Sequence, residues 1–390
     1  MALFYVVAGV TFPEGMAGTK RVKHYLTSMS EKEYSVGIVN FENGKAWCES
    51  INLGSTEVQI FRFKLSRLFN LVNLLSNKRD QKCLLVYSGI SLQNIHIVLL
   101  AKIFNWKIIV DYVEDFRYHQ ENVSTLRKLK IRSILFFENH ITKLADGLIV
   151  ISKHLCSKFV DITKGSIPIQ LISIAVDLDS KPQTTIPASN SGKFNIVYSG
   201  SFGNKDGLDI VFRAIRELNE EGYAVNLCLT GSKDNLHNLQ GIHDHPNIKF
   251  LGYLSSEELT KLQMGADVLL MSRVNSMQNV ASFPFKLGEY LLTGKPVIAT
   301  SVGDVVDYLQ DGVNAFLIEP ESVTALKNAI IQILTNPENA SFVGLVGYNT
   351  CIKYFSKEVV AQNLVRLIDS IYTSAPKDNI SAPFYDKKNK

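Results

Sequence analysis

Lys286 and Glu289 are the two residues of this chain whose types and spacing best fit ligand-binding chemistry. They lie in the run FPFKLGEYLLTGKPVIAT, residues 283–300, which reads as a short helix, a glycine turn at Gly294 and a buried strand. Residues three apart on a helix point the same way. A lysine beside the free N–H groups of a helix start favours an anion, and a carboxylate one turn later can accept two hydrogen bonds from a ribose diol. The alternative is an exposed helix pair without a ligand.

A glycine-containing turn nearer the middle of the chain is a second candidate for phosphate binding. An apolar run at residues 194–198 leads into Gly200, Gly203 and Gly207, and an amphipathic helix follows. Glycine lets the backbone approach a ligand closely, and the start of a helix favours phosphate. Lys205 lies inside this turn and adds a positive charge. The second half of the chain is therefore predicted to bind a phosphorylated ligand.

Two more candidate segments lie in the first half of the chain. The first apolar run leads into a loop with Gly15 and Gly18 that opens a helix. The glycine spacing is not that of a dinucleotide-binding motif, and a plain turn between strand and helix is the alternative. A later strand-like run at residues 107–110 ends beside Asp111 and Glu114, where parallel sheets bind ligands. The alternative there is a carboxylate pair that caps the next loop.

The order of these segments along the chain resembles that of the nucleotide-sugar site in the retaining glycosyltransferase family 4, whose members have the GT-B fold. Glu289 matches the second of two glutamates typical of that family, and Pro296 and Val297 match the strand that follows it. The position of the first glutamate is occupied by Ala281. The run FPFKLGEYL resembles the form found in many envelope-polysaccharide transferases. The resemblance is strongest between residues 195 and 320 and weaker before them.

The chain departs from that family at three further positions. The family's phosphate-binding turn carries an arginine where this chain has Ser201, and its lysine position is Asp206, one residue after Lys205. A histidine that contacts the donor sugar in several branches is Val113 here. The resemblance then implies that Lys205, Lys286 and backbone N–H groups hold the diphosphate.

The resemblance implies a hexosyltransferase that moves a hexose, with retention of configuration, from a nucleotide diphosphate sugar to a glycan or lipid-linked glycan. A UDP-sugar is the favoured donor, and O-antigen or capsule synthesis is the expected setting. Neither a metal nor a cofactor is expected besides the donor. The catalytic roles fall to Lys205, Lys286 and Glu289. Donor binding is expected from Gly200, Ser201, Gly203, Gly231, Gly252, Tyr253, Ser282, Phe283, Phe285 and Glu289. The acceptor or its phosphates are expected beside Gly15, Gly18, Thr19, Arg21, Asp111 and Glu114.

Two other functions stay open. The missing glutamate, histidine and arginine allow a partner subunit that binds nucleotide sugars without transferring them. The second of these alternatives is a UDP-sugar 2-epimerase with the GT-B fold. Release of free UDP without an acceptor would indicate the epimerase.

The length of the chain predicts two domains or more, and the resemblance implies that they are of the α/β class. The chain has 390 residues, 46% of them hydrophobic and 20% charged. Five scattered cysteines without CxxC spacing argue against a zinc site and for a reducing cytoplasm. The resemblance implies two Rossmann-like domains facing each other across a cleft. The expected boundaries are residues 1–180 for the acceptor-side domain, 193–350 for the donor domain, 355–372 for a helix that crosses back to the first domain, and 375–390 for a disordered tail.

Positive charge is concentrated in the first 180 residues, which carry 22 Lys and Arg against 16 Asp and Glu. Apolar residues at helical spacing with interleaved Lys and Arg run through residues 58–79, and residues 124–145 read as a basic amphipathic helix or helix pair. Such patterns favour anionic lipid head groups, and a solvated face over an ordinary core is the alternative. The expected partners are a nucleotide-sugar donor, a glycan or polyprenyl-diphosphate-linked acceptor and an anionic membrane surface, with no nucleic acid. The expected location is cytoplasmic, at the inner face of the cell membrane.

Overall fold

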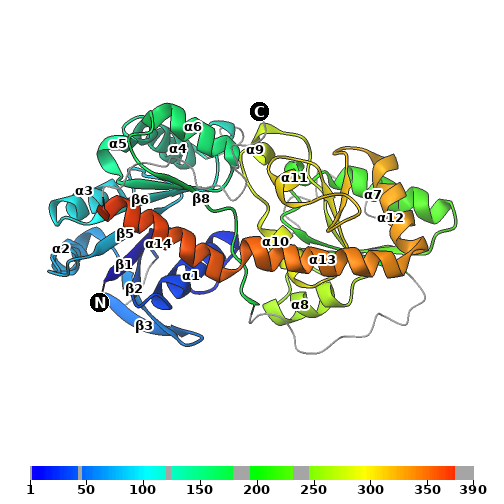
Figure 1. The fold of residues 1–390 in the computed structure, drawn as a ribbon, viewed down its shortest axis with the longest axis horizontal. Helices are drawn as coiled ribbons and strands as arrows, with labels where there is room; N and C mark the ends of the chain where they lie inside the picture. Colours follow the sequence, from blue (N-terminus) through cyan, green and yellow to red (C-terminus); the bar gives the residue numbers. More distant parts are fainter. Residues whose placement is uncertain (1, 43–45, 120–123, 179–193, 232–245, 374–390) are drawn as a thin grey trace. The chain divides into compact units, whose positions relative to one another are not determined.

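A computed structural model describes residues 2–42, 46–119, 124–178, 194–231 and 246–373 of the chain (Figure 1). The chain divides into two α/β units. The first unit comprises the residues up to Ala175 and the C-terminal segment from Lys357, and the second comprises Val176–Ser356. The polar run at 182–192 and the tail after 375 lie outside the described residues.

The first domain contains an eight-stranded sheet in the order β3-β4-β2-β1-β5-β6-β7-β8. All its strand pairs are parallel except the antiparallel pair β3 and β4. Its strands are β1 (Leu3–Ala8), β2 (Ser35–Asn40), β3 (Cys48–Leu53), β4 (Thr56–Arg62), β5 (Lys82–Tyr87), β6 (Lys107–Tyr112), β7 (Gly147–Val150) and β8 (Ile169–Leu171).

The helical interpretation of residues 58–79 was wrong for their first part. Strand β4 runs through Arg62, and buried Thr56, Val58 and Ile60 alternate with more exposed Glu57 and Gln59, which is the two-residue period of a strand. Helix begins only after this strand.

Helices cover both faces of this sheet. Helix α1 (Ala17–Ser30) and the last helix α14 (Lys357–Thr373) pack against each other, and Figure 1 shows them side by side over the strands. Tyr372 on α14 anchors that helix, because its hydroxyl exchanges hydrogen bonds with the backbone of Lys82 on β5. The remaining helical segments are η1 (Leu65–Arg67), α2 (Leu68–Leu75), α3 (Ile95–Ile103), η2 (Phe116–Tyr118), α4 (Thr125–Glu138), α5 (Ile141–Leu144) and α6 (Lys153–Thr163).

The second domain contains a six-stranded parallel sheet in the order β11-β10-β9-β12-β13-β14. Its strands are β9 (Phe194–Gly200), β10 (Val225–Gly231), β11 (Ile248–Phe250), β12 (Val268–Met271), β13 (Val297–Thr300) and β14 (Phe316–Ile318). Its helical segments are η4 (Asn204–Asp206), α7 (Leu208–Glu220), α8 (Ser256–Met264), α9 (Met277–Val280), α10 (Phe285–Leu292), α11 (Val305–Tyr308), α12 (Val323–Thr335) and α13 (Pro337–Phe355).

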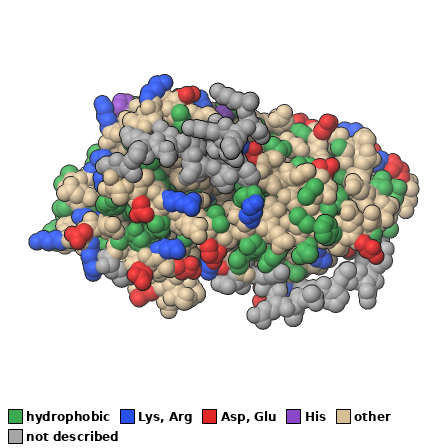
Figure 2. All heavy atoms as spheres, in the orientation of Figure 1, with side chains coloured by type: hydrophobic (Ala, Val, Ile, Leu, Met, Phe, Trp, Pro, Cys, Tyr) green, Lys and Arg blue, Asp and Glu red, His purple; other side chains and the backbone are tan. Residues whose placement is uncertain are grey.

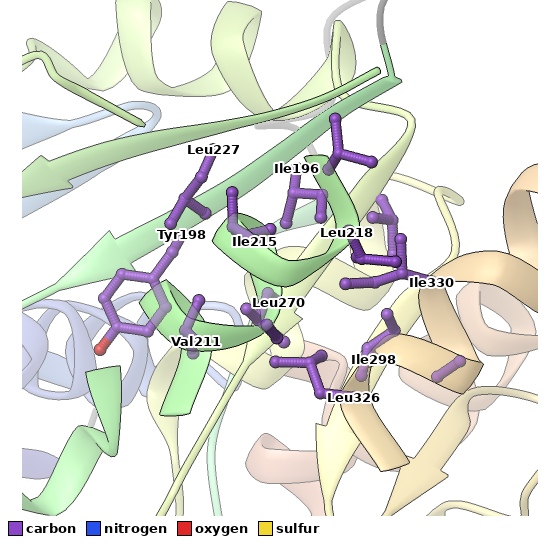
Figure 3. Close-up of a cluster of buried hydrophobic side chains, with 14 of the residues drawn as sticks. Ile196, Tyr198, Val211, Ile215, Leu218, Leu227, Leu270, Ile298, Leu326 and Ile330 are labelled. Atoms are coloured by element: carbon purple, nitrogen blue, oxygen red, sulfur yellow. The ribbon is translucent and has the colours of Figure 1, made fainter. Parts of the chain in front are cut away.

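The core of this domain fixes helix α7 against the sheet. Val211, Ile215 and Leu218 lie on one side of α7 at helical spacing, and they pack over Ile196 on β9 and Leu227 on β10 (Figure 3). All five side chains are fully buried. Because the helix cannot shift along this surface without opening cavities, its N-terminal end stays beside the carboxyl ends of the strands.

No helix in the described part of the chain is long and apolar enough to cross a membrane.

Candidate functional site

The strand order of the second domain marks a point where a ligand is expected. The chain leaves β9 for β10 on one side and leaves β12 for β13 on the other, while β9 and β12 pair directly. In open α/β sheets, ligands bind outside the carboxyl ends of the strands at such a switch point. Gly200 ends β9 at this place, and Ser272 follows β12.

Three of the predicted donor glycines meet there. Gly231 pairs with Gly200 in the sheet register, and its N–H donates to Gly252 O at 2.9 Å. A Cβ on Gly231 would come within 1.8 Å of Gly200 O, and its φ of +140° is one that other residues rarely adopt. The sequence therefore needs glycine here so that two strand ends and the following loop can lie close together.

Lys286 extends from helix α10 to this same strand end. Its Nζ lies 2.8 Å from Tyr198 Oη and 3.5 Å from Asp206 Oδ1. A Cβ on Gly200 would lie 2.6 Å from Tyr198 Oη and 2.8 Å from that Nζ, so a larger residue here would have to displace one of these side chains. Helix α10 is held in position by Tyr290, whose hydroxyl accepts a hydrogen bond from Ser199 N at 2.8 Å.

Asp206 organises the phosphate-binding turn that the sequence predicted. Its Oδ2 accepts hydrogen bonds from Gly203 N at 3.1 Å and from Ser201 Oγ at 3.4 Å, and the side chain is almost completely buried. Lys205 precedes it with a half-buried side chain. The turn residues and Lys286 are therefore brought together through a carboxylate to which sequence analysis assigned no role.

The charges in this cluster shift one another's pKa values. The pKa of Lys286 is lowered to about 8, chiefly by burial; Asp206 raises it in part, and nearby Arg273 and Lys205 contribute to lowering it. Burial alone would raise the pKa of Asp206, but the charges of Lys286 and Lys205 bring it below its usual value. Three cations surround one carboxylate, so the cluster carries excess positive charge that an anionic ligand would neutralise.

Arg273, which contacts Asn279, is a further residue of this region that the sequence did not mark as a site residue. Arg273 is buried, and its Nη1 makes only long hydrogen bonds, at 3.4 Å each, to Asn279 O and Ser282 Oγ. Its Nε and Asn279 Oδ1 are buried without a hydrogen-bond partner. Within the described residues no carboxylate lies within ion-pair distance of Arg273. Its only sequence signal is a lone arginine directly after an apolar strand.

Five other predicted donor residues differ in their exposure and in their contacts. Glu289 lies one turn after Lys286 on α10 and is half-buried, and Phe285 begins that helix. Tyr253 is exposed directly after Gly252. Phe283, however, is buried in a ring cluster with Tyr308 and Phe355, which indicates a packing role. Ser282 Oγ donates a hydrogen bond to Gln278 O at 2.9 Å and accepts the long hydrogen bond from Arg273 Nη1.

In the first domain, the predicted glycine loop follows β1 beside the switch point between β1 and β5. A Cβ on Gly15 would lie 2.6 Å from Thr11 O, and Thr19 Oγ1 donates to that same carbonyl at 2.7 Å. A Cβ on Gly18 would lie 2.8 Å from Tyr87 Oη at the end of β5. The loop is therefore tightly closed, and Thr19 is used within it.

Arg21 and Asp111 require a correction. Both side chains are buried and form a two-point ion pair, with Arg21 Nε 2.7 Å from Asp111 Oδ2 and Nη2 2.9 Å from Oδ1. Arg21 also donates to the carbonyls of Ile172 and Ser173, and Tyr25 Oη donates to Asp111 Oδ2 at 3.0 Å. Donors and acceptors are used internally, so this pair fastens α1 to the sheet and leaves no surface for an acceptor.

Glu114 behaves differently from Asp111. Its side chain is 41% exposed, and its Oε2 lies 3.6 Å from His119 Nε2. Of the carboxylates at the end of β6 that the sequence assigned to acceptor binding, only Glu114 can therefore reach a ligand. In the part of the chain that the structure describes, no group of three or more His, Cys, Asp or Glu side chains could hold a metal ion.

Comparison with known proteins finds similarity to glycosyltransferases over part of the chain. Residues 193–336 match the family described as glycosyl transferases group 1. An uncharacterised 41.2 kDa protein in the cps region of Klebsiella pneumoniae is 25% identical over 215 residues, which cover 53% of this chain and 56% of that protein. The uncharacterised glycosyltransferase MJ1178 of Methanocaldococcus jannaschii is 25% identical over 242 residues, 61% of this chain and 62% of that one. These relatives are thus matched over little more than half of their length.

Solved structures of other proteins superpose on almost the whole chain. Sucrose-phosphate synthase from Thermosynechococcus elongatus superposes with a TM-score of 0.72 at 17% identity, covering 96% of this chain and all of that one. Anabaena Alr3699/HepE in complex with UDP and glucose gives a TM-score of 0.69 at 14% identity, with coverage of 95% and 100%. At these identities the likeness establishes the fold. The two parallel-sheet domains are those of the GT-B fold, as the sequence predicted.

Proposed function

We propose that this chain is a retaining glycosyltransferase of family 4 that transfers a hexose from a nucleotide diphosphate sugar, with a UDP-sugar favoured. The observation that carries the proposal is the position of Lys286. It is a largely buried lysine with a lowered pKa, set against a glycine strand end at the switch point of a domain that matches the group 1 glycosyl transferases.

The diphosphate would bind at the end of β9. Lys286 and Lys205 supply the positive charge, and no side chain caps the N-terminus of α10, the helix that carries Lys286. Negative charge on the leaving diphosphate increases in the transition state. Fixed cations and dipoles that are already oriented lower the barrier, because they need no rearrangement during the reaction.

Glu289 would accept hydrogen bonds from the two ribose hydroxyls one helical turn away from the phosphates. No nucleophile of the protein is required if the acceptor hydroxyl attacks the front face of the sugar and passes its proton to a phosphate oxygen of the donor. The new glycosidic bond forms as the bond between the anomeric carbon and the diphosphate oxygen breaks. The reaction then balances without a metal, and the stereochemistry is retained.

The acceptor we propose is a glycan, or a glycan linked to polyprenyl diphosphate, used in surface polysaccharide synthesis. The cps-region name of the Klebsiella relative supports this setting. UDP and glucose bound to the Anabaena structure support a UDP-sugar donor. The candidate acceptor residues are Gly15, Gly18 and Glu114 of the first domain.

Calorimetric titration with UDP-, GDP- and ADP-sugars tests the donor proposal. We expect one nucleotide class to bind, and Lys286→Met to weaken it by about tenfold or more, since a hydrogen bond to a charged group contributes about 1.5–3 kcal/mol. Lys295→Met is the matched control, because Lys295 lies in the same segment, is also half-buried and is not part of the cluster. Equal loss in both variants, or no binding by the parent protein, would refute the proposed donor site.

A partner subunit that binds nucleotide sugars without transferring them is the second candidate. Ala281, Val113 and Ser201 replace three usual functional residues, and Asp111 is used internally. Donor binding without glycosyl transfer, across a panel of lipid-linked acceptors, would favour it.

A further inference from the structure

Three neighbouring strands of the first domain end at matched positions in its sheet. In the strand register, Asn40 on β2 pairs with Ala8 on β1 and with Arg62 on β4. The residues that follow these three therefore lie in a row at the carboxyl edge of the sheet, and they are Gly9, Phe41 and Phe63. Ligands of α/β proteins bind at this edge, yet the proposed function gives these residues no role.

Aromatic side chains follow one another along this row. The rings of Phe41 and Phe63 meet edge to face with their centroids 6.2 Å apart, and the ring of His96 on α3 lies 5.1 Å from that of Phe63. Phe63 is buried, whereas Phe41 and His96 are half-buried. Burial lowers the pKa of His96, so its imidazole is neutral at pH 7. The row is therefore an uncharged aromatic surface that solvent reaches in part.

Gly9 leaves a gap beside the Phe41 ring. A Cβ on Gly9 would lie 3.8 Å from Phe41 Cδ2 and 3.8 Å from Gln93 Nε2, which is ordinary van der Waals contact. The φ of Gly9 is not positive, so neither crowding nor backbone conformation requires glycine here. Gln93 is exposed, and the next residue, Asn94, is buried and donates to Gly89 O at 3.1 Å. A ring and a held amide thus border an unfilled position.

We call this group of side chains the edge cluster, and it consists of Gly9, Phe41, Phe63, Gln93 and His96.

Hydrogen bonds of Asn40 hold the edge cluster in place. Asn40 is fully buried, and its Nδ2 donates to Val10 O at 2.8 Å. Its backbone carbonyl accepts from Phe63 N at 2.8 Å, and its Oδ1 accepts from Glu42 N at 2.7 Å. The backbone on both sides of Phe41 is therefore tied to the loop after β1 and to the end of β4. A ligand would meet a surface that is already ordered, which lowers the entropic cost of binding.

Arg62 is the cation beside the edge cluster, and carboxylates already pair with it. Its Nη1 lies 2.8 Å from Glu42 Oε2, and its Nη2 lies 2.7 Å from Glu49 Oε1 on β3. Glu42 Oε2 also accepts from Phe12 N at 3.2 Å. Figure 2 shows Asp and Glu side chains beside Lys and Arg side chains in the part of the first domain where Figure 1 places β3 and α1. This face does not present the positive charge of one sign that would favour an anionic ligand.

We propose that the edge cluster binds a neutral sugar ring of the acceptor glycan, with the C–H face of the sugar against Phe41 and its hydroxyls on the Gln93 amide. The face of an aromatic ring is negative and attracts the weakly positive C–H groups of a sugar. An amide has an acceptor oxygen and two donor hydrogens, so it can bind neighbouring hydroxyls. Because the cluster is uncharged, a phosphate of the acceptor would have to bind elsewhere.

This inference deepens the proposed function, because it names the part of the acceptor that this edge recognises, and its place in the reaction rests on that proposal. Its test uses neither donor nor turnover. A failure of sugar binding and a failure of donor binding are therefore separate results.

Saturation-transfer difference NMR on the full chain tests the proposal with the methyl glycosides of glucose, galactose, mannose, N-acetylglucosamine and rhamnose. We expect at least one of them to receive saturation at its ring C–H protons. Gly9→Ala should weaken its binding by about tenfold or more, because the added methyl group fits the fold but fills the gap. Gln93→Ala should weaken it by about threefold to tenfold through the lost hydrogen bond, and Phe41→Leu by about threefold or more through the lost ring face.

Two control variants match these changes on the second domain. Gln310→Ala removes an exposed amide, and Phe342→Leu removes an exposed ring on α13. Both should bind the glycoside like the parent protein. Thermal unfolding of all five variants shows whether each is folded. Gln93 is exposed, so the Gln93→Ala arm stands even if Phe41→Leu does not fold.

Competition identifies the chemistry that the edge cluster recognises. Uridine and inorganic pyrophosphate are added in turn to the parent protein with its bound glycoside, and neither should displace it. Displacement by uridine would assign the edge cluster to a nucleobase, and displacement by pyrophosphate would assign it to an anion. Either result would overturn the proposal. So would a parent protein that binds none of the five glycosides, unchanged binding in folded Gly9→Ala, or equal losses in the test and control variants.

Discussion

The Nζ of Lys286 lies 4.0 Å from the centre of the Tyr198 ring and 2.8 Å from the hydroxyl of the same side chain. One tyrosine thus contacts the lysine through its π face and its polar end. The cation–π contact favours the charged lysine, while burial opposes it. Lys286 is therefore fixed in position, with a pKa close to the physiological range.

The first prediction concerns pH. Burial lowers the pKa of Lys286 to about 8, so the lysine loses its proton as the pH rises from 7 to 9. UDP affinity should fall over this interval by about tenfold or more, because a charged hydrogen bond is lost. A bound diphosphate raises that pKa again, so UDP binding at pH 8.5 should take up a proton. Calorimetry in buffers of different ionisation enthalpy measures that uptake, and Lys286→Arg should abolish it.

The sign of the accompanying stability change is opposite to that of a salt-bridged lysine. The folded-state pKa lies below the ordinary value of 10.5, so between about pH 8 and 10.5 the unfolded chain binds more protons at this position than the folded chain. The contribution of Lys286 to the free energy of unfolding should therefore rise with pH in this window. A Lys286→Met variant without ligand should lose this rise, as denaturant unfolding at pH 7 and pH 10 would show.

The second prediction concerns Glu289. Glu289→Ala should weaken UDP binding by about 1.5–3 kcal/mol, the contribution of hydrogen bonds to a charged group, if the carboxylate binds the ribose. Uridine alone should lose as much affinity as UDP, because the phosphates are bound elsewhere. Glu358→Ala, on α14 of the first domain, serves as a control. A folded Glu289→Ala protein with unchanged affinity for UDP would exclude this residue from the site.

The sequence predicts local elements of the site better than contacts between residues that are far apart in the chain. Helix α10 and strand β13 could be predicted from residues 283–300, because apolar spacing, a glycine and a strand follow one another there. The capping box of α8 is an equally local feature, because Ser255 and Glu258 are only three residues apart. Contacts that join distant segments could not be predicted in this way. Arg21 and Asp111 are 90 residues apart, and nothing near either one shows that they pair.

The contact between Asp206 and Lys286 was missed for the same reason, because 80 residues separate them in the sequence. Asp206 stands where the resembling family has a lysine, and only the structure shows that its carboxylate links the turn at Gly203 to Lys286. Strand β4 was missed because Val58, Ile60 and Phe61 satisfy both a strand and a helix pattern over so few residues.

The third prediction distinguishes structure from function at Asp111. Asp111→Asn leaves Arg21 buried without its counter-charge, and breaking a buried ion pair from one side costs about 3–5 kcal/mol. Urea unfolding should show this loss in the free energy of unfolding. UDP affinity should stay unchanged in the protein that remains folded. Glu114→Gln, an exposed carboxylate on the same strand end, should leave stability unchanged. A stable Asp111→Asn protein with impaired acceptor use would restore Asp111 to the acceptor site.

The last prediction assigns a role to Arg273. A buried guanidinium without a carboxylate partner is costly, because desolvation of the charge is not compensated. Its pKa is lowered by this burial, and its Nε has no hydrogen-bond partner. An anionic oxygen of the donor would supply the missing partner. Arg273→Gln should therefore weaken binding of the donor by about tenfold or more, while the ligand-free protein keeps or gains stability.

Two measurements separate this role from a purely structural one. Thermal unfolding without ligand tests whether Arg273 mainly braces residues 274–282 through Asn279 O and Ser282 Oγ, in which case Arg273→Gln would lower the melting temperature and leave UDP affinity unchanged. Calorimetry with UDP, UDP-glucose and UDP-glucuronic acid identifies the anionic oxygen. Equal losses for all three place Arg273 at the diphosphate, and a loss confined to UDP-glucuronic acid places it at a carboxylate of the sugar. Arg216→Gln, an exposed arginine of α7, should change none of these values.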